Sequence, residues 1–424
     1  MGRLVAAVAI ALVAGGTAAG SAPSSQPPQP PLLGLTGPPG ALTRIEAATL
    51  RPVGRRVPTA AHNFGWSVSP DGALAAAGTD GTGDLRLYDV RAMRRAGDVD
   101  LHAQGLVFAT AWAAPRLVLA VVVSPGCCGL GDTTVTGVDA AARRVVWSRR
   151  LNGSLQAGGS FARSVVLVLG PKRGLGQSRL AVVGPQGAVR SAPLPWIRSG
   201  IAHSGARTPE AFTSETWNPG LAIDPRGRAF VVQHAPVVAE VDLRTLRAVP
   251  HELRGRTTLA ALKGEAGPTR SAVWLGNARI AVTGVDSSIS KDAAGHLQQH
   301  ERAAGLAIVD TRAWTVRRID TGTSRFVLAG RTLVCFGVVS DSAAQRLSGG
   351  GLRGYSLDGS PLFHRYGDDP ISFAVPVGSR LLVAGAAGSR LFDRGALVDP
   401  RTGRELRRVG FSTTPVSPTA DFWY

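Results

Sequence analysis

The sequence predicts an all-β protein built from about eight repeated units, and three observations lead to this prediction. A strand–turn–strand pattern recurs along the chain, and a second hairpin lies between its copies. The third observation is that 53 Gly and 28 Pro are scattered over the 424 residues. Such a composition favours many short strands joined by turns. The chain has no apolar stretch of helical period long enough for a helical bundle.

The recurring hairpin is clearest at 396–410, ALVDPRTGRELRRVG. It combines an apolar strand, an acidic residue that opens a turn, and a strand that alternates apolar and basic residues. A carboxylate at the start of a turn can accept hydrogen bonds from the following backbone N–H groups. We therefore interpret Asp399 as a turn residue. The related hairpins are centred on Glu46, Asp89, Asp139, Gly184, Asp242, Asp310 and Asp358.

The second hairpin is clearest at 65–78, GWSVSPDGALAAAG, where Ser-Pro-Asp-Gly forms the turn between two half-buried strands. Successive units are roughly 40 to 70 residues long, and a four-stranded propeller blade needs about this length. The sequence therefore predicts a β-propeller of four-stranded blades. The further copies of this hairpin lie at 105–123, 160–170, 218–233, 271–284, 324–337 and 371–385.

Eight blades are the preferred count, and seven are the alternative if the least regular unit, 157–198, is not a blade. The first unit has only an outer hairpin, Thr43–Val57, and the residues after Gly410 resemble only an inner one. These two halves would pair and close the ring with N- and C-terminal strands. Closure removes the unpaired sheet edges of an open array.

The chain divides into residues 1–22, 23–40 and 41–424. The first segment has a short basic start, an apolar core at Leu4–Ala14 and small residues after it, the pattern of a secretory signal peptide. An uncleaved N-terminal anchor is the alternative. The second segment, rich in Pro, Ser and Gly, predicts a disordered linker, and the third is a single propeller domain. We expect the protein to be secreted or held in the cell envelope.

The repeats resemble known propeller families. GVDAAARRVVWSRRL, around Asp139, resembles the repeat of pyrroloquinoline-quinone-type propellers, and the Ser-Pro-Asp-Gly turn resembles that of WD40, TolB-like and YVTN propellers. The resemblance covers about residues 41–424 and is limited to the pattern of strands and turns. It implies a β-propeller fold, which enzymes and inert scaffolds share.

The net charge of +18 comes almost wholly from Arg. A charge of this size can favour an anionic envelope polymer as a partner. The alternative is the codon bias of a high-GC genome, which raises Arg, Ala and Gly together. The basic residues are spread along the chain without a nucleic-acid-binding motif, so we expect no nucleic-acid partner.

Insertions between the repeats point to a functional face. The larger ones, 124–133, 171–178, 285–305 and 339–354, mostly follow the second strand of a unit. Because they share this phase, they should emerge at one end of the propeller, together with the links 198–218 and 251–270. The alternative is that these loops simply tolerate insertion.

Four residues in these insertions are candidate site residues. Cys127 and Cys128 are adjacent and could form a strained disulfide ring, which some quinone-dependent dehydrogenases of the resembling family place against their cofactor. Structural or incidental thiols are the favoured interpretation, since the other features of those enzymes are missing. His296 and His300 are four residues apart, a spacing that puts two metal ligands on one side of a helical turn. A solvated loop is favoured there.

We therefore expect a non-catalytic binding scaffold, monomeric and without a cofactor, whose loop-bearing face binds a protein, peptide or glycan of the cell envelope. The alternative is a propeller enzyme, either a lactonase-like hydrolase or a quinone-dependent oxidoreductase. The sequence has no G-x-S-x-G, Walker or H-E-x-x-H motif that would favour the enzyme.

Overall fold

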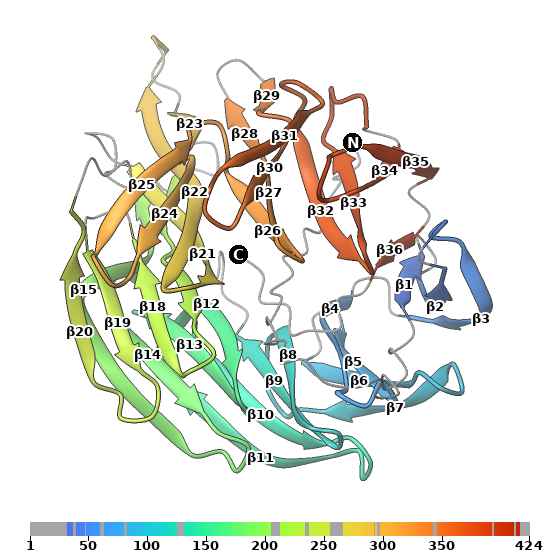
Figure 1. Cartoon of the computed structure of the whole chain (residues 1–424). Coiled ribbons are helices and arrows are strands. Elements are labelled where there is room, and N and C mark those ends of the chain that lie inside the picture. The colour runs from blue at the N-terminus through green and yellow to red at the C-terminus, as the bar shows by residue number, and fades with distance from the viewer. Residues whose placement is uncertain are drawn as a thin grey trace.

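The protein is an eight-bladed β-propeller in a computed structural model (Figure 1). The structure describes residues 32–36, 40–46, 48–59, 63–79, 83–124, 131–204, 213–233, 237–254, 266–291, 293–294, 297–341, 346–391, 394–410 and 413–415. All regular elements in these segments are antiparallel strands. None of the described segments contains a helix with the length and apolar character that a membrane crossing requires.

Each blade is one antiparallel sheet, and its strands are given below in order from the innermost to the outermost. The described strands form eight sheets, and the unit at 157–198, which is the least regular in sequence, forms the third of them. The prediction of eight blades rather than seven is therefore confirmed. Blade 1 contains β4 (Asn63–Val68), β5 (Leu74–Thr79), β6 (Asp84–Asp89) and β7 (Arg94–Asp100), and blade 2 contains β8 (Leu106–Ala114), β9 (Leu117–Val123), β10 (Thr133–Asp139) and β11 (Arg144–Leu151). Blade 3 contains β12 (Ser154–Phe161), β13 (Ser164–Gly170), β14 (Gly174–Val183) and β15 (Val189–Ser204), followed by β16 (Thr213–Trp217), and blade 4 contains β17 (Gly220–Ile223), β18 (Arg228–Val232), β19 (Val237–Asp242) and β20 (Ala248–Glu252).

The next three blades include two inserted hairpins. Blade 5 contains β21 (Ala266–Gly276), β22 (Arg279–Lys291), β24 (Leu306–Asp310) and β25 (Thr315–Asp320), with the inserted strand β23 (Leu297–Ala303). Blade 6 contains β26 (Arg325–Ala329), β27 (Thr332–Phe336), β30 (Leu352–Ser356) and β31 (Pro361–Arg365). The strands β28 (Val338–Asp341) and β29 (Arg346–Gly349) are inserted between β27 and β30 in the chain and belong to the sheet of blade 5. Blade 7 contains β32 (Ile371–Val377), β33 (Arg380–Gly385), β34 (Arg394–Val398) and β35 (Glu405–Gly410).

Blade 8 closes the ring and corrects two expectations. It contains β36 (Thr413–Pro415), β1 (Leu33–Thr36), β2 (Ala41–Ile45) and β3 (Pro52–Pro58), in that order from the axis. The N-terminal side thus supplies three strands rather than two, and β1 lies inside the expected linker 23–40. Leu33 is only 1% exposed, so this short apolar stretch gains burial by joining the sheet. Figure 1 shows the red β36 beside the blue β1.

The core is divided into eight layers, each between two neighbouring blades. Between blades 8 and 1, for example, Leu33 and Leu42 pack with Trp66 and Tyr88. Because successive side chains of a strand point to opposite faces, each blade supplies residues to two layers. Inner strands buried on both faces consequently read as continuous apolar runs such as SVVLVLG in β13.

The acidic residues of the recurring hairpin cap turns, as predicted. Asp139 Oδ1 accepts hydrogen bonds from the N–H groups of Ala141 and Ala142, both at 2.9 Å. Asp399 Oδ1 accepts one from Arg401 at 2.8 Å, and this bond holds the pKa of Asp399 below its usual value. The interpretation of Asp399 as a turn residue is confirmed. The same arrangement occurs at Asp89, Asp242 and Asp310.

Candidate binding face

Long strands extend beyond blades 5 and 6 on one end of the propeller. β22 has 13 residues; Arg279–Val282 pair with β24 inside blade 5, and Val285–Lys291 pair with the inserted β23. β23 meets β28, which follows β27 of blade 6 in the chain, at the bridge between His300 and Asp341, and β28 pairs with β29. The extension of blade 5 is thereby joined to the extension of blade 6 as one sheet.

Blade 3 contributes a second extension beside the first. β15 has 16 residues, and its last part, Arg198–Ser204, pairs with the start of β14 and with β16. β16 leads into Asn218, whose N–H donates to Pro268 O at 3.0 Å and whose carbonyl accepts from Arg270 N at 2.8 Å. These bonds connect the end of β16 to β21 of blade 5.

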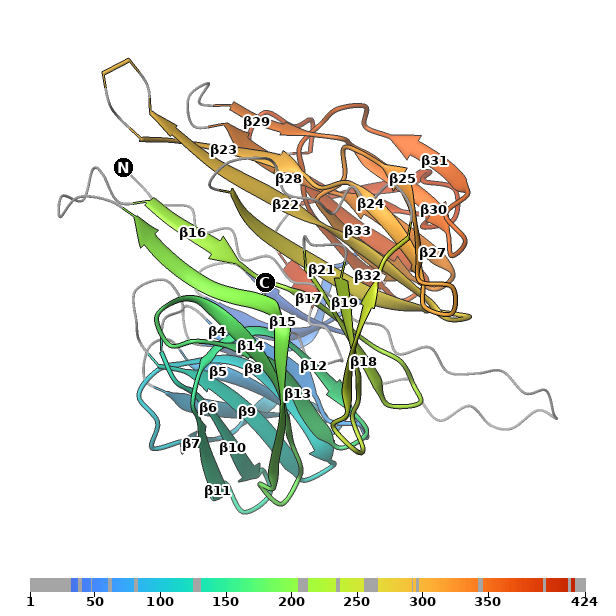
Figure 2. The same cartoon turned by 90° about the vertical axis from the view of Figure 1, so that its left-hand side faces the viewer.

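We call this structure the hairpin wall: the extended parts of β14, β15, β21 and β22 together with β16, β23, β28 and β29. Figure 2 shows β16, β23 and β29 projecting on the same side of the ring. Gly267 permits the close approach of β21 to β16, since a Cβ there would lie 2.6 Å from the Thr216 carbonyl oxygen. The structure therefore offers one continuous, backbone-bonded surface over three blades.

The wall explains most of the predicted insertions. Residues 285–305, 339–354, 171–178 and 198–218 contribute their described parts to it, so the prediction that they emerge at one end is confirmed for them. The expectation that they are loops is wrong, because they are largely paired strands. Residues 125–130 and 255–265, within the other two predicted segments, lie outside the described residues.

A buried ion pair holds the base of the wall. Arg270 Nη2 and Asp286 Oδ1 are 2.6 Å apart, and both side chains are at most 1% exposed. Arg270 Nη1 also donates to the carbonyl oxygens of Thr269 and Val285. Burial lowers the pKa of Arg270, and the Asp286 carboxylate opposes this shift. Guanidinium groups stay protonated in proteins, so the pair locks β21 against β22.

A carboxylate joins the two hairpins of the wall. Glu301 Oε2, on β23, accepts hydrogen bonds from the backbone N–H of Ser340 at 3.0 Å and from its hydroxyl at 2.9 Å. Arg325, at the start of the inner strand β26, is half-buried; burial lowers its pKa, and the charge of Glu301 acts in the opposite direction. Neither the Arg270–Asp286 ion pair nor the Ser340–Glu301 hydrogen bonds could be predicted from local sequence patterns, because in each case the partners come from different strands.

Only one of the four candidate site residues lies in the described part of the chain. His300 is in β23, and its Nε2 is 2.8 Å from Ser290 Oγ on β22. Its segment is a strand, so neither the solvated loop nor a helical turn is correct for it. Cys127, Cys128 and His296 lie outside the described residues. Their proposed roles, like that of His300, stay predictions.

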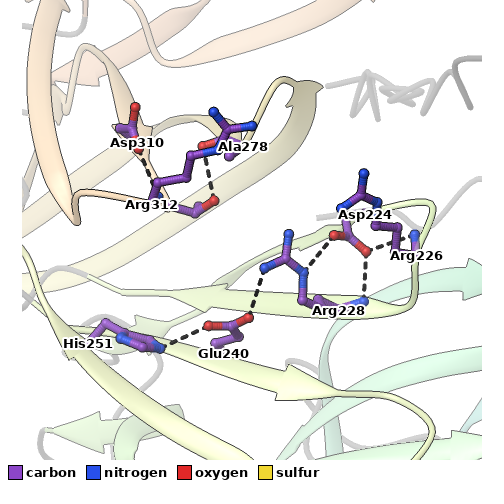
Figure 3. Close-up of polar contacts among 9 residues, drawn as sticks. Asp224, Arg226, Arg228, Glu240, His251, Ala278, Asp310 and Arg312 are labelled. Carbon is purple, nitrogen blue, oxygen red and sulfur yellow. Dashed lines mark hydrogen bonds and ion pairs between the residues drawn. The ribbon is translucent and has the colours of Figure 1, made fainter.

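A chain of charged side chains lies at the opposite end, on blade 4 (Figure 3). Asp224 accepts from Arg228 Nε at 2.8 Å, and Arg228 Nη1 lies 3.2 Å from Glu240. Glu240 in turn lies 2.9 Å from His251, whose ring stacks on Trp314 of blade 5 with centroids 3.6 Å apart. The stacking of His251 on Trp314 joins this chain of blade 4 to blade 5.

Within the described ranges, His, Cys, Asp and Glu side chains form no group of three that could hold a metal ion. Cys335, in β27, is buried as predicted, and burial raises its thiol pKa well above the usual value.

Comparison with known proteins shows the fold. The chain is similar to the dihydro-heme d1 dehydrogenase NirN, solved in complex with DHE, with a TM-score of 0.55 and 14% identity over 93% of this chain and 77% of that chain. It is also similar to BamB from Moraxella catarrhalis (TM-score 0.45, 12% identity, 83% and 92% covered) and to the β-propeller domain of Cps50 (Swd1) from Myceliophteria thermophila (0.39, 10%, 77% and 93%). No protein-family model and no curated protein matches the sequence. At 14% identity the likeness to NirN supports the β-propeller fold and nothing finer.

Proposed function

We propose that the protein is an exported, non-catalytic scaffold that binds a protein partner through the hairpin wall. The observation that carries this proposal is that extended strands of blades 3, 5 and 6 are linked above the ring. The His300–Asp341 bridge links blade 5 to blade 6, and the backbone bonds of Asn218 link blade 3 to blade 5. Extra strands of this length are not needed to complete four-stranded blades. A preformed surface also loses little conformational freedom on binding.

The wall exposes both polar and apolar side chains that a protein partner could contact. Leu347, on β29, is 38% exposed and offers an apolar contact on the wall, and the neighbouring Ser348 is also exposed. On the blade 3 side, the guanidinium of Arg198 lies 5.7 Å from the ring centre of Trp217. Aromatic and Arg side chains are enriched at the centres of protein interfaces. Export is supported by the signal-peptide pattern at residues 1–22.

Photo-crosslinking tests the proposal. A photoreactive amino acid at Leu347 should capture a partner from the cell envelope or medium of the source organism. The matched control places it at Leu362, which is 48% exposed on β31, the outermost strand of blade 6. We expect a discrete crosslinked product from Leu347 and none from Leu362.

The captured partner should then be purified and its affinity measured. Leu347→Glu should weaken binding at least tenfold, because it places a charge in the contact, whereas Leu362→Glu should leave affinity within twofold. Equal crosslinking from both positions, or equal affinity of both variants, would remove the wall as the binding surface. Envelope glycans and peptides, added as competitors, would show whether either class is the ligand instead.

A further inference from the structure

A cleft on the turn end of blade 5 is separate from the hairpin wall. It has a volume of about 670 Å³, within the range of small-molecule sites. Its polar lining consists of Asn277, Arg279, Asp310, Arg312, Thr315 and Arg317, and we call it the arginine cleft. Figure 3 shows Asp310 and Arg312 at the turn beside Ala278.

The cleft and the wall lie at opposite ends of β22. Arg279 is the first of its 13 residues and Lys291 the last. A strand advances about 3.3 Å per residue, so Arg279 is roughly 20 Å from Val285, where the wall begins on β22, and at most roughly 40 Å from Lys291. A ligand in the cleft therefore does not depend on the partner proposed for the wall.

The lining carries an excess of positive charge. Three guanidiniums face one carboxylate, and Asp310 Oδ1 is engaged by the N–H groups of Arg312 at 2.8 Å and Ala313 at 3.0 Å. Among the described residues, Arg279, Arg312 and Arg317 form no ion pair within 4.0 Å. Their charge is thus available to an anion from solution.

Two of the three guanidiniums are held in place by blade 6. Arg279 Nη1 donates to Leu357 O at 3.4 Å, and Arg317 Nη2 donates to Asp358 O. Each guanidinium has five N–H donors, so both retain donors for a ligand. No hydrogen bond from the exposed Arg312 guanidinium to another described residue exists, and this side chain can close over a bound anion.

We propose that the arginine cleft binds a phosphate group, as a free phosphate or as part of a phosphate ester or phosphodiester. Arginine forks match the oxygens of phosphate in bidentate geometry. A tetrahedral phosphate presents several acceptor oxygens in different directions and can engage three guanidiniums at once. A carboxylate has only two oxygens and leaves one guanidinium unmatched.

Isothermal titration calorimetry of the full chain with inorganic phosphate and with polyphosphate tests the proposal. Arg312→Ala is the reporting variant, because its side chain makes no bond to another blade among the described residues. We expect it to weaken binding of both probes roughly tenfold or more, since hydrogen bonds to charged groups are among the stronger ones.

The matched control is Arg318→Ala. Arg318 follows Arg317 on β25, is exposed, and does not line the cleft. Because both variants replace one arginine by alanine, they have the same net charge. The affinity of Arg318→Ala should stay within twofold of the unaltered protein. The proposal would be overturned if neither probe binds. It would also be overturned if the two variants lose affinity equally, whether for both probes or for polyphosphate alone. Thermal unfolding of both variants verifies that the fold is retained.

Discussion

Asp320, at the end of β25, accepts four hydrogen bonds and joins blade 5 to blade 6. Its Oδ2 accepts the Tyr355 hydroxyl at 2.7 Å and contacts Arg353, while Oδ1 accepts from Gly322 N at 2.7 Å and Thr323 Oγ1 at 2.8 Å. Burial alone would raise the pKa of Asp320, but the bonds from Tyr355, Arg353 and Thr323 outweigh it and hold the pKa below its usual value. The carboxylate is thus stabilising in its charged form.

Replacing Asp320 by Asn tests this at the residue scale. At pH 7 the variant should lose about 1.5–3 kcal/mol of unfolding free energy, because bonds to a charged acceptor are replaced by weaker ones. A lowered pKa means that the contribution is present above the unfolded-state value, near 3.9, and is lost as pH falls through the folded-state value. Urea unfolding from pH 7 to pH 2.5 should therefore show the difference from the unaltered protein shrinking.

Tyr355→Phe is the control for this pH series. It removes one donor and leaves the carboxylate, so its loss should be smaller than that of Asp320→Asn at pH 7. If the Asp320→Asn difference stays constant over the whole pH range, the carboxylate charge is not the stabilising feature.

Whether a residue's role could be predicted from the sequence depends on how far its hydrogen-bond or ion-pair partner lies along the chain. Asp139 and Asp399 were predicted as turn residues because each caps N–H groups two or three positions later. Asp320 and Arg353 are 33 residues apart, and Arg270 and Asp286 are 16 apart. No local pattern marks such pairs, since only the strand registers bring them together.

At the scale of elements, the hairpins of the blades could be predicted and those of the wall could not. The blade strands are apolar or alternate strictly, as in LVLAVVV of β9, and this signals burial. β23 reads LQQHERA, which has no such pattern and low strand preference. It is a strand because β22 pairs with one side and β28 bridges to the other.

Glu301→Ala should loosen the wall more than the propeller. The variant removes the carboxylate that accepts both hydrogen bonds from Ser340. The single His300–Asp341 bridge then remains as the strand pairing between β28 and β23. Hydrogen exchange at 297–303 and 338–341 should become faster, while exchange in β24 stays unchanged and the melting temperature falls only slightly, through the lost charge compensation at Arg325. Faster exchange throughout blades 5 and 6 would contradict this separation of wall and ring.

At the scale of the whole molecule, ring closure depends on one short strand. β36 pairs with β1 through Gly34–Pro415, Leu35–Thr414 and Thr36–Thr413. A chain that ends at Gly410 lacks β36 and leaves β1 as an open edge beside the axis. We expect its melting temperature to fall by several degrees, and its tendency to aggregate to rise, because unpaired edges associate.

A chain that ends at Pro415 is the comparison for this truncation. It retains all three pairs and should melt close to the complete chain in differential scanning calorimetry. If both truncated chains melt alike, β36 does not hold the ring closed.

The division of the core into eight layers has a consequence for composition. Linear repeat proteins need terminal repeats with a polar outer face, because their end units have a neighbour on one side only. Here blade 8, assembled from both ends of the chain, packs against blade 7 through Ile45 and Leu50 and against blade 1 through Leu33 and Leu42. No unit is terminal, so none requires a capping face. Because every blade has a neighbour on both sides, a chain with 44% hydrophobic residues can form eight sheets that are apolar on both faces and still bury these faces.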